Sequence, residues 1–137
     1  MTNKFSLPVK EPFTQVSIRV PTRMLEEISK LLDKSGYNRK QRSLWVREAL
    51  VSLLSRPDYA NLVAEEFITP GTTQQIPLSF TRKQLDAAEE AIVNVASEEG
   101  VKTDRSAIVR TAIIQRILAE NNSQLKPMGI PVQGALL

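Results

Sequence analysis

The sequence contains neither cysteine nor histidine. Without cysteine the chain can form no disulfide, no thiolate zinc site and no cysteine nucleophile. Without histidine it lacks the commonest metal ligand and the commonest general base near neutral pH. An active site would need paired carboxylates or a buried lysine, but the acidic residues fall on the polar faces of the expected helices. We therefore expect no enzyme, no bound metal and no other cofactor.

Long apolar runs are also missing, and none approaches the roughly 18 residues that are needed to span a bilayer. Residues 1–13 carry polar residues and prolines where a signal peptide has its apolar segment. A chain without disulfides also suits a reducing compartment. These features predict a cytoplasmic protein that does not associate with a membrane.

The charged residues are unevenly distributed along the chain. The formal net charge is +3, from 18 Lys and Arg against 15 Asp and Glu. Residues 13–55 hold eight basic and four acidic residues, whereas residues 72–120 hold six basic and seven acidic residues. The excess of positive charge favours an anionic partner that is bound mainly by the first half of the chain.

Two segments that lie sixty residues apart follow the alternating pattern of a half-buried strand. They are residues 15–20 and 75–80. The residues on their apolar faces are Val16, Ile18, Val20, Ile76, Leu78 and Phe80. After each strand the apolar residues recur at helical spacing. The two helical stripes are Leu25, Ile28, Leu31 and Leu32, and Leu85, Ala88, Ile92 and Val95.

Residues at the ends of these helices support the same pattern. Thr81 with Gln84 forms a capping box, and Asp104 is a natural cap for a second helix in the later half. Asn38 with Gln41 serves the same purpose in the earlier half. Two glycines, Gly36 and Gly100, end the first helices.

The second helix of each half carries the sharpest internal match. Residues 42–50 align with residues 105–113 at an offset of 63, and Arg, Ser, Val, Arg and Ala recur at identical spacing. The chain is therefore a duplicated strand–helix–helix. We expect Trp45 and its counterpart Ile108 to lie in the core, and Arg47 and Arg110 to be structural or solvated rather than to contact DNA.

One unit cannot fold alone, because a single strand leaves its backbone groups unpaired. The two strands of the chain can pair antiparallel over four helices, which predicts a mainly α fold with a two-stranded antiparallel β-ribbon. The expected parts are an N-terminal arm (1–13), a first unit (14–55), a linker with at most one helical turn (56–73), a second unit (74–120) and a disordered tail (121–137).

The repeated residues resemble the ribbon-helix-helix (MetJ/Arc) superfamily. The resemblance lies in Val-Ser-Ile-Arg-Val-Pro at 16–21, in the amphipathic helix up to Gly36, and in Arg-Ser-x-x-Val-Arg-x-Ala at 42–49 and again at 105–112. Family members are usually homodimers in which each subunit gives one strand. The resemblance implies that this chain forms one intramolecular pseudo-dimer. Tandem versions resemble the TraY-type relaxosome accessory proteins of conjugative plasmids, to which residues 56–59 are faintly similar.

The resemblance implies a ribbon that enters the major groove of double-stranded DNA, where its outward side chains read bases. These would be Gln15, Ser17, Arg19, Gln75, Pro77 and Ser79. Arg suits guanine and Gln suits adenine as bidentate partners. The family also anchors phosphates at the start of the second helix. The residues there are Arg39, Lys40, Arg42, Ser43, Arg105 and Ser106.

The second strand departs from the family pattern. Pro77 has no N–H to donate and so belongs at an outer edge position. Ser79 stands where the first strand has the cation Arg19. We therefore expect the first strand to contribute most of the base readout.

Three functions remain open at this stage. The first is a sequence-specific transcriptional regulator, such as a repressor, and the second is a relaxosome accessory protein at an origin of transfer in plasmid conjugation. Either one could associate with further copies on tandem DNA sites. The third is an antitoxin-like protein whose tail binds a protein partner, although only 17 residues follow Glu120.

Overall fold

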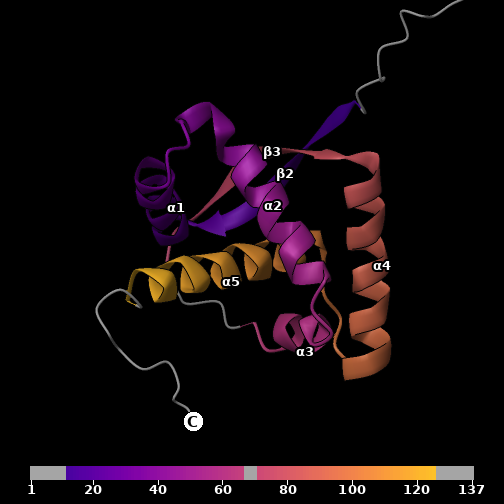
Figure 1. Cartoon of the computed structure of the whole chain (residues 1–137). Helices are drawn as coiled ribbons and strands as arrows, with labels where there is room; N and C mark the ends of the chain where they lie inside the picture. Colours follow the sequence, from indigo (N-terminus) through magenta and orange to yellow (C-terminus); the bar gives the residue numbers. More distant parts are fainter. Residues whose placement is uncertain (1–11, 67–70, 126–137) are drawn as a thin grey trace, which may run out of the picture.

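The protein, described by a computed structural model, is defined over residues 12–66 and 71–125, with side chains up to residue 122 (Figure 1). The order strand–helix–helix occurs twice. The first unit comprises β2 (Phe13–Pro21), α1 (Thr22–Lys34), the 3₁₀ turn η1 (Arg39–Gln41) and α2 (Arg42–Leu54). The second comprises β3 (Thr73–Thr81), α4 (Arg82–Glu99) and α5 (Arg105–Leu125), and α3 (Tyr59–Ala64) lies between the units.

The two strands pair with each other as an antiparallel ribbon, as predicted. Phe13 lies opposite Thr81, and Pro21 lies opposite Thr73. The central pair joins Ser17 to Pro77, which are equivalent residues of the two units. The register therefore places the two units symmetrically about the middle of the ribbon.

The inward face of the ribbon forms one layer of the core, because every second strand residue is apolar. The buried strand residues are Ile18, Val20, Ile76, Leu78 and Phe80. α2 and α5 pack on each other and on this face, with α1 and α4 on opposite sides of them (Figure 1). Trp45 and Ile108 are both fully buried, which confirms the prediction that they belong to the core.

The helix starts follow the predicted capping residues. Thr81 Oγ1 accepts a hydrogen bond from the Gln84 N–H at 3.2 Å, and the Thr81 N–H donates to Gln84 Oε1 at 2.9 Å. Asp104 Oδ1 accepts from a backbone N–H in the first turn of α5 at 2.9 Å. In the first unit the Asn38 N–H donates to Gln41 Oε1 at 3.0 Å, which fixes η1 directly before α2.

The two predicted glycine stops are also confirmed. Gly100 ends α4 in the left-handed conformation, with φ of 68°. Gly36 has φ of 84° and follows the last turn of α1. There the Tyr37 N–H donates to the carbonyl of Leu32 at 3.0 Å. A side chain would strain the backbone at both positive φ values, so glycine is the residue that suits both turns.

The boundaries differ from expectation in three places. The linker contains α3, whose Ala60 and Val63 are buried in the common core, so this part of the linker contributes to the folded body. α5 continues to Leu125, past the expected end at residue 120, because no proline or glycine lies between Gly100 and Pro127 to interrupt the helix. Residues 126–137 of the tail lie outside the described residues. In the N-terminal arm only Pro12 and Phe13 are described, and Phe13 belongs to β2.

Candidate nucleic-acid interface

The six residues that were predicted to read bases share one face of the ribbon. It is the face turned away from the helices, because the alternate residues of both strands are the ones that lie in the core. Five of the six side chains are exposed, and Ser79 is half-buried. The six form three cross-strand pairs, which are Gln15 with Ser79, Ser17 with Pro77 and Arg19 with Gln75. The fold therefore gathers all six on one continuous surface.

Two side chains of this face interact with each other. Ser17 Oγ donates a hydrogen bond to Gln75 Oε1 at 2.7 Å, so the Gln75 amide group is oriented across the strands. Arg19 makes its hydrogen bonds to other described residues through its backbone, and its exposed guanidinium is not among the donors. Arg19 thus presents its fork of N–H donors to solvent.

The backbone of Arg19 is held by α5, which belongs to the other unit. Ser106 Oγ accepts a hydrogen bond from the Arg19 N–H at 3.1 Å. Arg110 Nη1 donates to the Arg19 carbonyl at 2.8 Å. Both backbone groups that Arg19 turns toward α5 are therefore satisfied, and the strand backbone that carries this exposed cation is held by α5.

The same arrangement recurs on the other strand. Ser43 Oγ accepts from the Ser79 N–H at 3.0 Å, and Arg47 Nη1 donates to the Ser79 carbonyl at 3.0 Å. Sequence reasoning identified the recurrence of Ser and Arg at identical spacing, but not that each pair binds the strand of the other unit. The hydroxyls of Ser43 and Ser106 accept hydrogen bonds from strand N–H groups, and each keeps its own hydrogen, which it can donate to a phosphate. Their contact with a phosphate stays a prediction.

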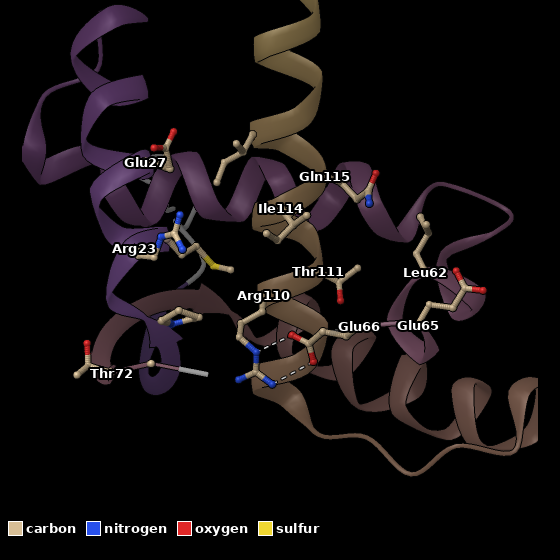
Figure 2. A pocket seen from close by; sticks show the side chains of 14 residues that line it. Arg23, Glu27, Leu62, Glu65, Glu66, Thr72, Arg110, Thr111, Ile114 and Gln115 are labelled. Carbon is tan, nitrogen blue, oxygen red and sulfur yellow. Dashed lines mark hydrogen bonds and ion pairs between the residues drawn. The ribbon is translucent and has the colours of Figure 1, made fainter. Parts of the chain in front are cut away.

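Arg110 is buried and is held by the carboxylate of Glu66, which follows α3 in the chain. Its Nε lies 2.6 Å from Glu66 Oε2 and its Nη2 lies 3.1 Å from Glu66 Oε1, and the two side chains are 6% and 17% exposed. This pair forms part of the wall of a pocket of about 780 Å³ between α1, α3 and α5 (Figure 2). The two charged groups satisfy each other there. The structural role that was predicted for Arg110 is confirmed.

Arg47, the counterpart of Arg110, has a different neighbour. Its guanidinium carbon lies 4.3 Å from the centroid of the Phe13 ring. Burial lowers the pKa of Arg47, and the adjacent Glu48 carboxylate acts in the opposite direction. Because Arg47 also donates to the Ser79 carbonyl, its structural role is confirmed too.

The predicted phosphate-binding residues lie at the starts of α2 and α5. Arg39 and Lys40 are exposed on η1, and Arg42 is the half-buried first residue of α2. Since Ser43 contacts β3 and Ser106 contacts β2, both helix starts abut the ribbon. Helix N-termini carry partial positive charge and favour anions.

Arg105 is less available than the basic residues of η1. Its Nη2 donates to Glu89 Oε2 of α4 at 3.2 Å, and its buried Nε has no hydrogen-bond partner among the described residues. The positive charge beside the ribbon is therefore stronger at the start of α2 than at the start of α5.

Within residues 12–66 and 71–125, no helix is both long and apolar enough to cross a membrane. In the same ranges no three acidic side chains lie close enough together to hold a metal ion. Similarity to known proteins gives no further guide: no family model, no curated protein and no solved structure matches this chain.

Proposed function

We propose that the protein binds double-stranded DNA in a sequence-specific manner as a ribbon-helix-helix protein, and that its two units form one intramolecular pseudo-dimer. In this proposal the β2–β3 ribbon enters the major groove. The observation that carries the proposal is the outward face of the ribbon. Its polar side chains are exposed, and residues at the starts of α5 and α2 hold the backbone of Arg19 and Ser79 on the two strands. This arrangement suits a rigid surface that presents donors and acceptors.

The size and chemistry of the ribbon match the major groove. The groove is about 12 Å wide and admits a two-stranded β-ribbon. Arg19 can donate two hydrogen bonds to guanine O6 and N7, and Gln15 or Gln75 can pair with adenine N6 and N7. Because Ser106 and Arg110 fix the Arg19 backbone, little ordering of the chain is needed when it binds.

The flanking helix starts provide the non-specific part of binding. Phosphate contacts position a protein on the duplex, and base contacts specify the sequence. Ser43 in the first turn of α2 contacts the ribbon, and the exposed Arg39 and Lys40 lie on η1 directly before this helix, where the DNA backbone would pass in the proposed complex. Such contacts release counterions and make the affinity depend on salt.

We propose regulation of transcription as the biological role, with a repressor as the simplest form. A relaxosome accessory protein would use the same face of the ribbon, so the position of the native site distinguishes the two roles. A site that overlaps a promoter supports regulation, and a site within a transfer origin assigns the protein to conjugation. The tail that an antitoxin-like protein would use lies largely outside the described residues.

The test is selection of bound duplexes from random DNA, followed by a search for the enriched sequence in the native replicon. We expect one enriched consensus for the wild-type chain and none for a variant that carries Gln15→Ala, Arg19→Ala and Gln75→Ala. The matched control carries Ser29→Ala and Lys30→Ala, two exposed positions on α1, and should select the wild-type consensus. Failure of the wild-type chain to enrich any sequence would refute the proposal.

A further inference from the structure

Phe13 is an exposed aromatic residue on the outward face of the ribbon. Its side chain is 55% exposed, although it is the first residue of a regular strand. It has the same parity along β2 as Gln15, Ser17 and Arg19, so it belongs to the same face. The other aromatic residues in the described ranges are buried or half-buried: Tyr37, Trp45, Tyr59 and Phe80.

The ring of Phe13 is held in place despite its exposure. The guanidinium carbon of Arg47 lies 4.3 Å from the ring centroid. Arg47 is itself fixed, because its Nη1 donates to the Ser79 carbonyl at 3.0 Å. A ring that rests on an anchored cation loses little freedom when a ligand packs against its exposed side.

This feature occurs at one end of the ribbon only. The residue equivalent to Phe13 in the second unit is Thr73, which is exposed and has no ring. The residue equivalent to Arg47 is Arg110, whose guanidinium is paired with Glu66. Phe13 lies opposite Thr81, so the aromatic end of the ribbon is the end next to α4.

We propose that Phe13 is a specificity-determining residue that packs on the C5-methyl group of a thymine in the major groove. The inference rests on the proposed function. A phenyl ring cannot hydrogen-bond to base edges, and apolar contact with the thymine methyl is the direct way in which it distinguishes a base. Phe13 thereby adds an apolar reader to the polar readers on the same face.

The position of the thymine follows from the ribbon. Phe13 is four residues from Ser17 at the centre of the register, about 14 Å at roughly 3.4 Å per residue. Along the groove this corresponds to about four base pairs at roughly 3.4 Å each. The thymine should therefore lie near one end of the site, with no counterpart at the other end.

The experiment replaces each thymine of the best selected duplex, one at a time, by deoxyuridine, which lacks the methyl group. Dissociation constants are measured for the wild-type chain, Phe13→Ala and Phe13→Leu. At one terminal thymine, loss of the methyl should weaken wild-type binding about fourfold, the value expected for one buried methyl group. Phe13→Ala should bind the thymine and deoxyuridine duplexes equally, and Phe13→Leu should keep part of the difference.

Val93→Ala is the matched control, because Val93 is an apolar residue of α4 that is 65% exposed and lies off the ribbon. It should retain the full methyl effect. In one contrary outcome the wild-type chain selects a sequence, but each deoxyuridine exchange weakens binding of the wild-type chain and of Phe13→Ala to the same degree. Phe13 then does not read a methyl group, and the proposed DNA binding is unaffected. Equal weakening of all duplexes by Phe13→Ala would mean that the ring packs on the sugar–phosphate backbone, which also overturns the inference. If the wild-type chain selects no sequence, the proposed function itself fails.

Discussion

Glu66 supports the strand that carries Arg19 without contacting it. Its carboxylate holds two nitrogens of the Arg110 guanidinium, and the third nitrogen, Nη1, donates to the Arg19 carbonyl. Arg110 is buried, and a buried cation that loses its partner is strongly unfavourable. One carboxylate that follows α3 in the chain therefore stabilises an outward residue of the ribbon.

Replacing Glu66 with Gln should destabilise the protein by about 3–5 kcal/mol, the cost of removing one partner of a buried ion pair and leaving the other charge unpaired. The measurement is urea unfolding followed by circular dichroism at neutral pH. Glu65→Gln is the matched control, because Glu65 is the exposed neighbour in the chain, and it should change the unfolding free energy by less than about 0.5 kcal/mol. Equal effects of the two substitutions would contradict the role assigned to the Glu66–Arg110 pair.

At the scale of elements, a second charged network joins α2 to α5 and to the turn after α1. Arg116 of α5 donates to Glu48 Oε1 at 2.9 Å and to the carbonyl of Trp45 at 2.9 Å, and its guanidinium lies 4.7 Å from the Trp45 ring centroid. Tyr37 also donates to Glu48 Oε1. Burial lowers the pKa of Arg116, but hydrogen bonds to Glu48, Tyr37 and Glu120 outweigh it and raise the pKa above its ordinary value.

The network should make stability depend on pH below about 4.5. The hydrogen bond from Tyr37, and next the one from Arg116, hold the pKa of Glu48 below its ordinary value of 4.5. A lowered folded-state pKa stabilises the fold above 4.5, and this contribution is lost as the pH falls through the lowered value. The difference in unfolding free energy between wild type and Glu48→Gln should therefore be largest above pH 4.5 and shrink below it.

Urea unfolding at a series of pH values on both sides of 4.5 measures this difference. Tyr37→Phe is the companion variant, because it removes the donor with the largest effect on Glu48 and leaves the ring in place. It should reduce the pH dependence without abolishing it. A difference between wild type and Glu48→Gln that stays constant across the range would show that the carboxylate is not stabilised by these donors.

The turn η1 is expected to act through phosphate contacts. Changing Arg39, Lys40 and Arg42 to Ala should weaken binding to all duplexes to a similar degree. The slope of log affinity against log salt should become shallower by roughly 0.9 for each phosphate contact that is lost. The measurement is affinity at several salt concentrations, with Lys30→Ala as the control for loss of one exposed charge on α1. An unchanged slope in the triple variant would mean that these residues make no phosphate contact.

The elements that sequence predicted well are those set by local pattern. Alternation in 15–20 and 75–80 placed the strands and their buried faces, and Thr81, Asp104 and Gly100 marked helix ends by capping rules that involve close neighbours. The shared outward face of the ribbon follows from the same alternation once the two strands pair. These features depend on interactions within a few residues, or on one strand pairing.

The features that sequence missed depend on contacts between distant residues. Glu66 and Arg110 are 44 residues apart, and no periodicity in either segment indicates that they meet. The same holds for Ser106 and Arg19, which are 87 residues apart. α3 was also underestimated, because its burial depends on packing against α4 and α5 rather than on its own short apolar stretch.

For the whole molecule, the pairing of β2 with β3 predicts a folded monomer. Both strands of the ribbon come from one chain, and the core joins residues from both units. Light scattering on the free protein should therefore give about 15.3 kDa. Measurement before DNA is added matters, because copies on tandem sites could associate. An obligatory dimer of twice that mass would show that like units pair across two chains.

The two units present different residues on the outward face of the ribbon, and under the proposed function this predicts a DNA site without two-fold symmetry. A homodimeric ribbon reads inverted half-sites because its two strands are identical. Here the first strand offers Gln15, Ser17 and Arg19, and the second offers Gln75, Pro77 and Ser79. The charges are also unequal, with eight basic and four acidic residues in 13–55 against six and seven in 72–120.

We therefore expect strong base preference, for guanine, under Arg19 and weak preference under Pro77 and Ser79. Arg19→Ala should cost about 1–3 kcal/mol on the best site and relax the preference at one position. Ser79→Ala should cost much less. α2 holds Ser79 through its backbone, and its short, half-buried side chain extends little toward a base. The measurement is a matrix of affinities for each variant against each base pair at fixed salt. A clean inverted repeat as the selected site, or equal losses for the two variants, would mean that both strands read DNA alike despite their different residues.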